Sequence, residues 1–173
     1  MTKACIICGR DIHSKRADAK FCSGACRVSH HRSKALPKAL TGSRRWIRHD
    51  ARKRPLRAAD GVSAGWQLPG SWVSYAEAKK SPFGTGVGIV LGGGIGCWDL
   101  DHCIVGGELL SWAREIIVGI ESPLWVERSM SGDGVHVFVH ATEGDAVKIR
   151  DGRNIEFYSH SRYVAVTSDR LDT

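Results

Sequence analysis

The sequence predicts an α+β fold, in which an antiparallel or mixed sheet with helices on one face follows a small module built on cysteines. Alternating apolar and polar residues in the last third of the chain indicate strands, and an apolar stripe at helical spacing after residue 107 indicates a helix. Two closely spaced cysteine pairs near the N-terminus indicate a separate small unit. We therefore divide the 173 residues into three parts, 1–35, 36–57 and 58–173.

Positive charge gathers in the N-terminal third. Residues 1–57 carry 16 Lys and Arg against 3 acids, whereas residues 58–173 carry 9 against 15. A segment of that density usually neutralises phosphates, and a solvated flexible tail is the alternative. No apolar run is long enough to span a bilayer and no signal peptide is recognisable, so we expect a cytoplasmic protein without a membrane partner.

The N-terminal cysteines form two short-spaced pairs, Cys5 with Cys8 and Cys22 with Cys26. This spacing is typical of a structural zinc site, in which two turns each supply two thiolates to one tetrahedral ion. His30 or His31 is an alternative fourth ligand, because His30 lies four residues after Cys26 on a predicted helix. With few apolar residues available, a Zn²⁺ module over residues 1–35 would depend on the metal to fold.

The stretch 36–57 is predicted to be a basic linker that doubles as a phosphate-contacting arm, with a short basic helix ending before Pro55. Its candidate nucleic-acid contacts are Arg44, Arg45, Trp46, Arg48, Arg52, Lys53 and Arg54.

A pair of acids ends the most distinctive apolar stretch. Residues 87–91 and 95–100 flank three glycines at 92–94, which predicts a tight hairpin. The two-residue period of a strand sends Asp99 and Asp101 to one face, where two like charges share a proton or need a cation between them. Mg²⁺ or Mn²⁺ suits carboxylate oxygens, and two unrelated acids at a solvated strand end are the alternative.

The remaining pattern predicts where other polar residues lie. Ser74 and Glu77 fit a capping box that opens a helix over residues 75–80, a second helix lies within 107–120, and strands occupy 124–129, 135–141, 154–159 and 163–167. If the apolar sides of these strands face the helices, the polar side carries Asp99, Asp101, His136 and Glu156. Ser131 and Gly132, in the turn before His136, would let an anion approach the backbone. Basic residues near Glu156 are candidates for a triphosphate site, although each alone is more often a surface residue: Lys148, Arg150, Arg153 and Arg162.

Three motifs in this order resemble the archaeo-eukaryotic primase superfamily, and within it the primase-polymerase domains of phages and plasmids. They are the acidic pair Asp99-Leu100-Asp101, the turn SGDGVH that leads to His136, and the strand segment NIEFYSHSRYVAVT that carries Glu156. The resemblance covers residues 66–171.

The resemblance implies an RRM-like catalytic core that performs two-metal nucleotidyl transfer on its open face. By this match Asp99, Asp101 and Glu156 would hold two Mg²⁺ or Mn²⁺ ions, and the nucleotide's phosphates would bind Ser131, Gly132, His136 and Arg162. The zinc module and basic arm would hold a single-stranded DNA template with its primer. Nucleoside triphosphates are the implied substrates, a replicative helicase is an implied partner, and the implied setting is phage replication in the host cytoplasm.

Two other function classes fit the same residues. Paired acids with a histidine also serve metal-dependent nucleases, and a zinc module with a basic arm also serves non-catalytic DNA-binding regulators. Because the chain ends soon after the third motif, we expect nucleotide addition more than de novo priming.

Overall fold

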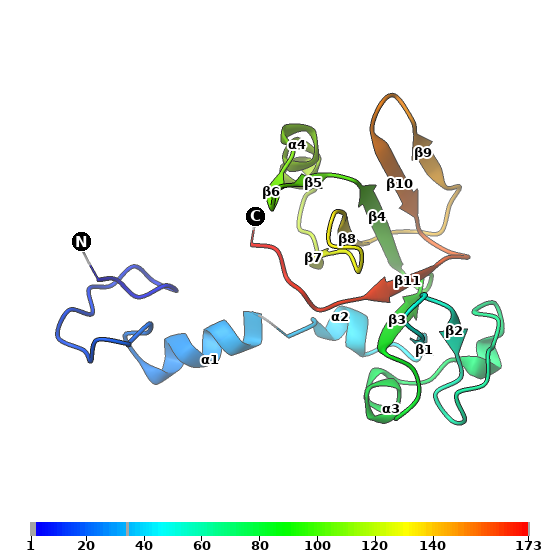
Figure 1. Cartoon of the computed structure of the whole chain (residues 1–173), viewed down its shortest axis with the longest axis horizontal. Coiled ribbons are helices and arrows are strands. Elements are labelled where there is room, and N and C mark those ends of the chain that lie inside the picture. Colours follow the sequence, from blue (N-terminus) through cyan, green and yellow to red (C-terminus); the bar gives the residue numbers. More distant parts are fainter. Residues whose placement is uncertain (1–2, 34, 173) are drawn as a thin grey trace. The chain divides into compact units, whose positions relative to one another are not determined.

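The computed structural model describes residues 3–33 and 35–172, without the side chains of residues 29–33. The chain forms two compact units, Met1–Leu36 and Pro37–Thr173 (Figure 1).

The first unit combines a short turn structure with one helix, α1 (Gly24–Ser33). Ala4 pairs with Asp11 in an isolated antiparallel bridge, and the Gly9 N–H donates to the Cys5 carbonyl at 2.9 Å. Among the described side chains of this unit, Cys5 and Ile12 are the buried apolar ones. Two such side chains are too few to hold a fold of this size without another stabilising element.

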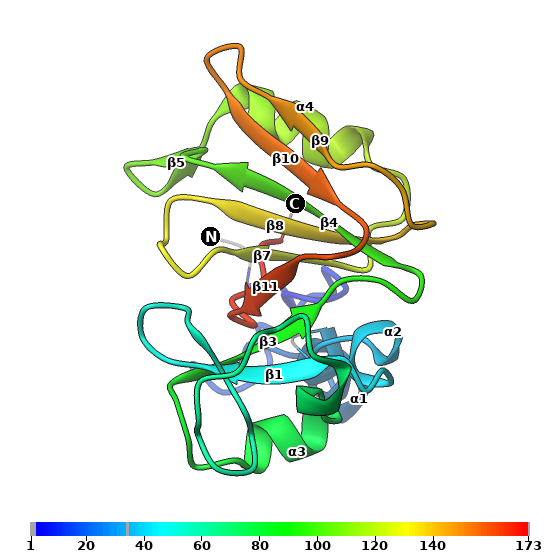
Figure 2. The ribbon, with the colours of Figure 1, turned by 90° about the vertical axis from the view of Figure 1, so that its right-hand side faces the viewer.

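The described residues of the second unit form antiparallel sheets and short α-helices, as the α+β prediction requires. The larger sheet has the order β7-β8-β4-β10-β9 (Figure 2), the smaller one β11-β3-β1-β2, and β5 and β6 form a separate pair. In chain order its elements are α2 (Lys38–Thr41), β1 (Trp46–His49), β2 (Pro55–Leu56), the 3-10 helix η1 (Pro69–Ser71), α3 (Tyr75–Lys80), β3 (Gly86–Val90), β4 (Ile95–Asp101), β5 (Ile104–Val105), β6 (Glu108–Leu109), α4 (Ser111–Gly119), β7 (Trp125–Arg128), β8 (Val135–His140), β9 (Val147–Ile149), β10 (Asn154–Tyr158) and β11 (Tyr163–Val166).

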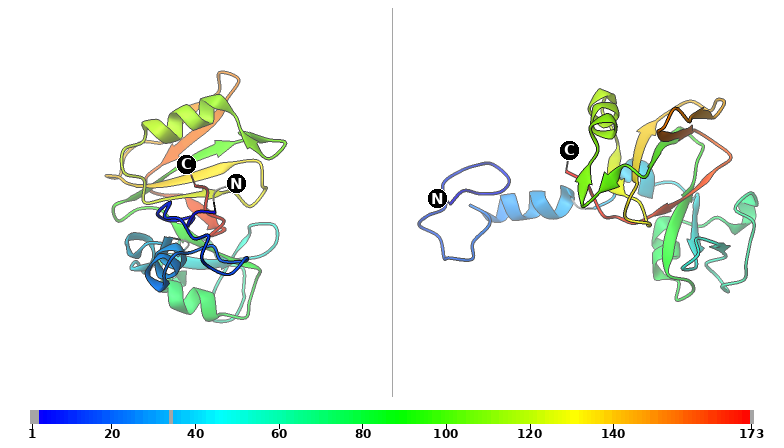
Figure 3. Two further views of the ribbon diagram at one scale, coloured as in Figure 1. Left: turned by 90° about the vertical axis from the view of Figure 1, so that its left-hand side faces the viewer. Right: turned by 45° about the horizontal axis from the view of Figure 1, so that its top comes forward.

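One face of the five-stranded sheet is apolar and packs against helix α4 (Figure 3). Leu100, Val137 and Ile155 from three neighbouring strands join Ala113 and Ile117 of the helix in one buried cluster. Because side chains alternate along a strand, the residues between them project from the opposite face. The polar residues of β4, β8 and β10 therefore lie on the side away from α4.

The predicted hairpin around the three glycines is wrong. The chain does turn there, with the Gly92 N–H donating to the Ile95 carbonyl at 3.2 Å and φ values of 122°, 64° and 90° at Gly92, Gly93 and Gly94. However, β3 pairs with β1 and β11, whereas β4 pairs with β8 and β10. The glycines join two sheets, because each flanking strand finds better partners far away in the sequence.

The predicted basic linker over residues 36–57 is also corrected. Trp46–His49 form β1, which lies between β3 and β2 with all four residues buried. Trp46 anchors this strand, since its indole N–H donates to the Leu40 carbonyl at 3.2 Å. The second unit therefore begins near residue 37 rather than 58.

The local signals for helix α3 are confirmed. Ser74 accepts from the Glu77 backbone N–H at 3.2 Å and the Glu77 carboxylate accepts from the Ser74 N–H at 2.8 Å, which completes the capping box. Within the described part of the chain, no helix has the length and apolar character needed to cross a membrane.

Candidate active site and metal centre

Strand register brings four polar residues into one row across the five-stranded sheet. Asp99 on β4 lies directly opposite both His136 on β8 and Glu156 on β10, and His136 lies opposite Glu127 on β7. Directly opposite residues share a face, so all four point away from α4. We call Glu127, His136, Asp99 and Glu156 the acidic row.

His136 is held between two carboxylates inside this row. Its Nδ1 lies 3.2 Å from Glu127 Oε1, and its Nε2 lies 3.7 Å from Asp99 Oδ1. The side chains of His136 and Glu127 are 6% and 0% exposed, whereas that of Asp99 is 21% exposed. The imidazole edge that carries Nε2 is therefore directed toward the more open end of the row.

Glu127 also fixes the chain behind the site. Its carboxylate accepts hydrogen bonds from the Trp125 indole at 3.0 Å and from the backbone N–H groups of Thr167 and Ser168 at 3.0 and 2.9 Å. Sequence reasoning missed this residue. The sequence signal was the alternation of this strand, in which Glu127 shares a face with Trp125 and lies on the face opposite to Val126. That is the face on which His136 lies.

Opposing effects act on the pKa values of Asp99 and Glu156. Burial raises the pKa of Asp99, His136 lowers it, and the neighbouring carboxylates of Asp101 and Glu156 raise it further, so that the net pKa lies above the usual value. Burial also acts to raise the pKa of Glu156, but hydrogen bonds from Tyr158 and Arg150 outweigh burial and lower it.

Glu156 is surrounded by donors from its own end of the sheet. Tyr158 donates to it at 2.7 Å, Arg150 donates to its other oxygen, and the Arg162 guanidinium lies 3.7 Å away while it stacks on the Tyr158 ring at 4.7 Å. The predicted nucleotide-binding residue Arg162 is thus adjacent to the acidic row. Tyr158 was not predicted to belong to the site.

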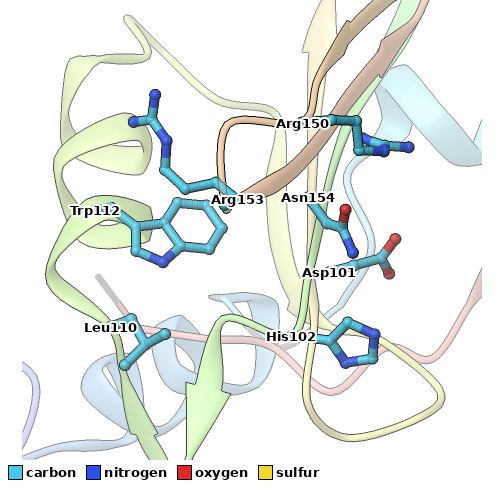
Figure 4. Close-up of a pocket in the computed structure, with 8 residues that line it drawn as sticks. Asp101, His102, Leu110, Trp112, Arg150, Arg153 and Asn154 are labelled. Atoms are coloured by element: carbon cyan, nitrogen blue, oxygen red, sulfur yellow. The ribbon is translucent and has the colours of Figure 1, made fainter.

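Asp101 lies one strand repeat beyond Asp99, opposite Asn154, at the end of β4. Its side chain borders a cavity at the edge of the sheet (Figure 4). The donors of Asp99, Asp101 and Glu156 suit a hard divalent ion, and the raised pKa of Asp99 marks negative charge that a cation would relieve. Their oxygens do not all lie within 4.8 Å of one another, since among the described residues only the cysteines form such a group. Chelation by all three would require Glu156 to exchange Arg150 for the ion.

The turn before β8 is closed by its own side chains. The Ser131 hydroxyl lies 2.9 Å from that of Ser129 and donates to Asp133, and Gly132 has φ 88°. Asp133 also lies 2.6 Å from Nδ1 of His102, and these two partners lower its pKa. The Asp133 carboxylate therefore already occupies the Ser131 hydroxyl that an anionic ligand would use.

The predicted nucleic-acid contacts divide into two groups. Trp46 is fully buried, Arg48 donates to the backbone carbonyls of Phe83 and Gly84, and Arg45 donates to those of Val90 and Leu91. These three have structural roles and do not present themselves to a DNA strand. The exposed members are Arg44, Arg52, Lys53 and Arg54.

The four N-terminal cysteines form a cluster that could hold a metal ion. Their sulfurs all lie within 4.8 Å of one another. The Cys8 sulfur is 3.5 Å from that of Cys22 and 3.8 Å from that of Cys26. Ligands about 2.3 Å from a tetrahedral zinc ion would be about 3.8 Å apart, so the spacing fits. The alternative ligands His30 and His31 lie outside the described side chains.

The thiols of this cluster cannot all ionise without a cation. Backbone hydrogen bonds from Cys22 and Ile7 lower the pKa of Cys5 to about 6. The Ser23 hydroxyl lowers the pKa of Cys26, but the sulfurs of Cys22 and Cys8 outweigh it and raise that pKa to about 12. A bound divalent metal would remove this conflict, because it stabilises every thiolate at once.

No protein-family profile matches the chain. The chain is similar to the DNA primase-polymerase of Nitratiruptor phage NrS-1, at 30% identity over 149 residues, which is 78% of this chain and 20% of that protein. It spans about one fifth of the length of this relative. The likeness supports a relationship between this chain and phage primase-polymerases.

Proposed function

We propose that the chain is a DNA-directed nucleotidyltransferase of the primase-polymerase type, with an RRM-like core, acting on a single-stranded DNA template. The observation that carries the proposal is the register of β8, β4 and β10, which sets His136, Asp99 and Glu156 side by side on one face. The likeness to a phage primase-polymerase supports the same class of chemistry.

In this proposal Asp99, Asp101 and Glu156 hold two divalent ions, Mg²⁺ or Mn²⁺. Bound there, the ions would lower the pKa of a primer 3′-hydroxyl and neutralise the charge on the triphosphate. The 3′-oxygen forms a bond to the α-phosphorus, the bond from that phosphorus to the bridging oxygen breaks, and pyrophosphate leaves.

The other residues of the site bind and orient the phosphates. His136 directs Nε2 toward them because Glu127 holds Nδ1, and Arg162 supplies charge at the Glu156 end of the row. Ser131 and Gly132 contribute their turn, in which a phosphate would replace the Asp133 carboxylate.

The N-terminal unit and the exposed basic residues hold the template strand. Zn²⁺ on Cys5, Cys8, Cys22 and Cys26 would keep the first unit folded. Of the basic set, Arg52 and Lys53 are exposed. Arg44 and Arg54 are also exposed, and a phosphate would replace their present partners Glu77 and Asp50. We place the protein in phage replication in the host cytoplasm, with a replicative helicase as its partner.

Extension of a labelled primer on a single-stranded template, with nucleotides and Mn²⁺, tests the proposal. Asp99→Asn should lower the extension rate by about a hundredfold or more, since metal-ion stabilisation contributes several kcal/mol. Asp145→Asn, the same change on an exposed loop, should leave the rate unchanged.

Loss of fold should not explain the Asp99→Asn result. The folded-state pKa of Asp99 is raised, so at neutral pH folding disfavours its charge, and a neutral side chain removes that cost. The variant should therefore unfold in urea at pH 7 no more easily than the wild type. Equal extension by both variants would refute the proposal.

The same assay, together with a titration of DNA binding, separates the two rival functions. Shortening of the primer without nucleotide would indicate a metal-dependent nuclease. A chain that changes neither primer nor template, and whose DNA binding depends on Cys22 but not on Asp99, would be a non-catalytic zinc-containing DNA-binding regulator.

A further inference from the structure

A cavity of about 400 Å³ lies at the edge of the five-stranded sheet, beside the acidic row (Figure 4). Asp101 at the end of β4 and Asn154 at the start of β10 face each other across the strand pair and form part of its wall. Trp112 comes from α4, and Arg150 and Arg153 come from the β9–β10 connection. The volume falls within the range of pockets that hold small ligands, about 300–1,000 Å³.

The cavity combines an aromatic ring with the guanidinium group of Arg153. Arg150 also borders the cavity, but its guanidinium group is directed to the other side, where it donates to Glu156 (Figure 4). Trp112 is half-buried, and Figure 4 shows its indole reaching from the helix toward the middle of the cavity, below Arg153. Aromatic faces of this kind stack on nucleic-acid bases, and guanidinium groups bind phosphate oxygens.

Arg153 can exchange its present partner for a phosphate. It pairs with Asp151, and its side chain remains 40% exposed. An ion pair at such exposure contributes little to stability. A phosphate offers the same acceptor geometry as the carboxylate it would displace.

We propose that this cavity binds one nucleotide of a single-stranded DNA, with the base against Trp112 and the phosphate on Arg153. The inference rests on the proposed function for the identity of the strand. Asp101 is shared with the proposed metal ligands and lies two residues from Asp99, roughly 7 Å along the strand. The bound nucleotide is thus a neighbour of the reacting one.

The charge and openness of the cavity favour a strand over a free nucleoside triphosphate. Arg153 is the cation beside Trp112, and Asp101 and Asp151 lie nearby, so the cavity has no excess of positive charge that would attract the dense charge of a triphosphate. Arg153 lies on a half-exposed connection, so a DNA backbone can continue into solvent on either side.

Anisotropy of a fluorescein-labelled oligo-dT, titrated with the full chain without added divalent ions or nucleotides, tests the inference. Trp112→Leu should weaken binding about tenfold, the usual effect of losing one base stack, and Trp112→Phe should keep most of the affinity. Arg153→Gln should reduce the slope of log K against log salt by about 0.7 for one lost phosphate contact. Lys80→Gln, which removes an exposed positive charge from α3, is the matched control and should leave the slope nearly unchanged.

Two results would overturn the inference. One is wild-type affinity in Trp112→Leu together with equal losses in Arg153→Gln and Lys80→Gln. The other is unchanged oligonucleotide affinity in Trp112→Leu together with an about tenfold loss of affinity for dTTP measured alone by equilibrium dialysis, which would assign the cavity to a free nucleotide. If Trp112→Leu fails to fold, Trp112→Phe and Arg153→Gln carry the test. This titration measures binding and not elongation. A chain that is inactive in primer extension can therefore still bind DNA through Trp112, and a chain that is active can lack this binding.

Discussion

Glu127 is a fully buried carboxylate whose two oxygens accept hydrogen bonds from four donors. It orients His136 and also holds the backbone of Thr167 and Ser168, so one residue joins the candidate site to the C-terminal segment. The two-residue period predicted the faces of Asp99, His136 and Glu156 because each lies in a clearly alternating strand. It did not identify Glu127, since hydrogen-bond partners from residues 40 positions away leave no local pattern.

Replacing Glu127 with alanine should destabilise the second unit by about 3–5 kcal/mol, because four buried donors would lose their acceptor. Urea unfolding followed by far-UV circular dichroism measures this difference. Glu121→Ala, the same substitution at an exposed position, should change the free energy of unfolding by no more than about 0.5 kcal/mol. Similar values for both variants would show that the Glu127 hydrogen bonds do not stabilise the fold.

At the level of elements, local signals predicted where strands and helices lie better than which strands pair. The capping box set the start of α3, and the alternating strands were found within one or two residues of their bounds. The pairing of β3 with β1 rather than β4 was missed because Trp46 and Ile47 sit in a strongly basic segment that resembles a linker. The short strands β5, β6 and β9 were also missed, since two or three residues carry no periodicity.

Among the three glycines between the two sheets, we expect Gly92 to tolerate substitution least. Its φ is 122°, and a Cβ there would lie 2.6 Å from the Arg45 guanidinium, which holds the strand end through Val90 and Leu91. Gly92→Ala should therefore cost about 1–3 kcal/mol. Chemical unfolding of this variant beside Gly144→Ala, where a Cβ meets nothing within 4 Å, measures the effect. Equal stability of the two variants would contradict it.

At the scale of the whole molecule, the chain separates a cysteine-based unit from a unit with a true apolar core. The cysteine spacing predicted that the four sulfurs lie close together, because the ligands of a tetrahedral site are constrained in sequence spacing. The extent of the second unit was not predicted, because residues 37–57 contribute to its smaller sheet through pairing with β3, whose residues lie 37 to 43 positions further along the chain.

Removal of the zinc ion that we propose for the cysteine cluster should unfold only the first unit. Its described apolar core consists of Cys5 and Ile12, whereas the second unit buries a continuous cluster between the five-stranded sheet and α4. Hydrogen exchange after chelation should show loss of amide protection in residues 3–33 and unchanged protection in β4, β8 and β10. Cys22→Ser should reproduce this pattern. Loss of protection in the second unit would mean that the two units do not fold independently.

The chain crosses between the two sheets at Gly92–Gly94 and again after Tyr158. These two connections limit how far the chain can be truncated. A truncation after residue 160 would retain every proposed catalytic acid but would strip β11 from the edge of β3. It would also take away the Thr167 and Ser168 amides that Glu127 binds. The smallest autonomous catalytic fragment must consequently reach past residue 168, although no proposed catalytic side chain lies beyond Arg162.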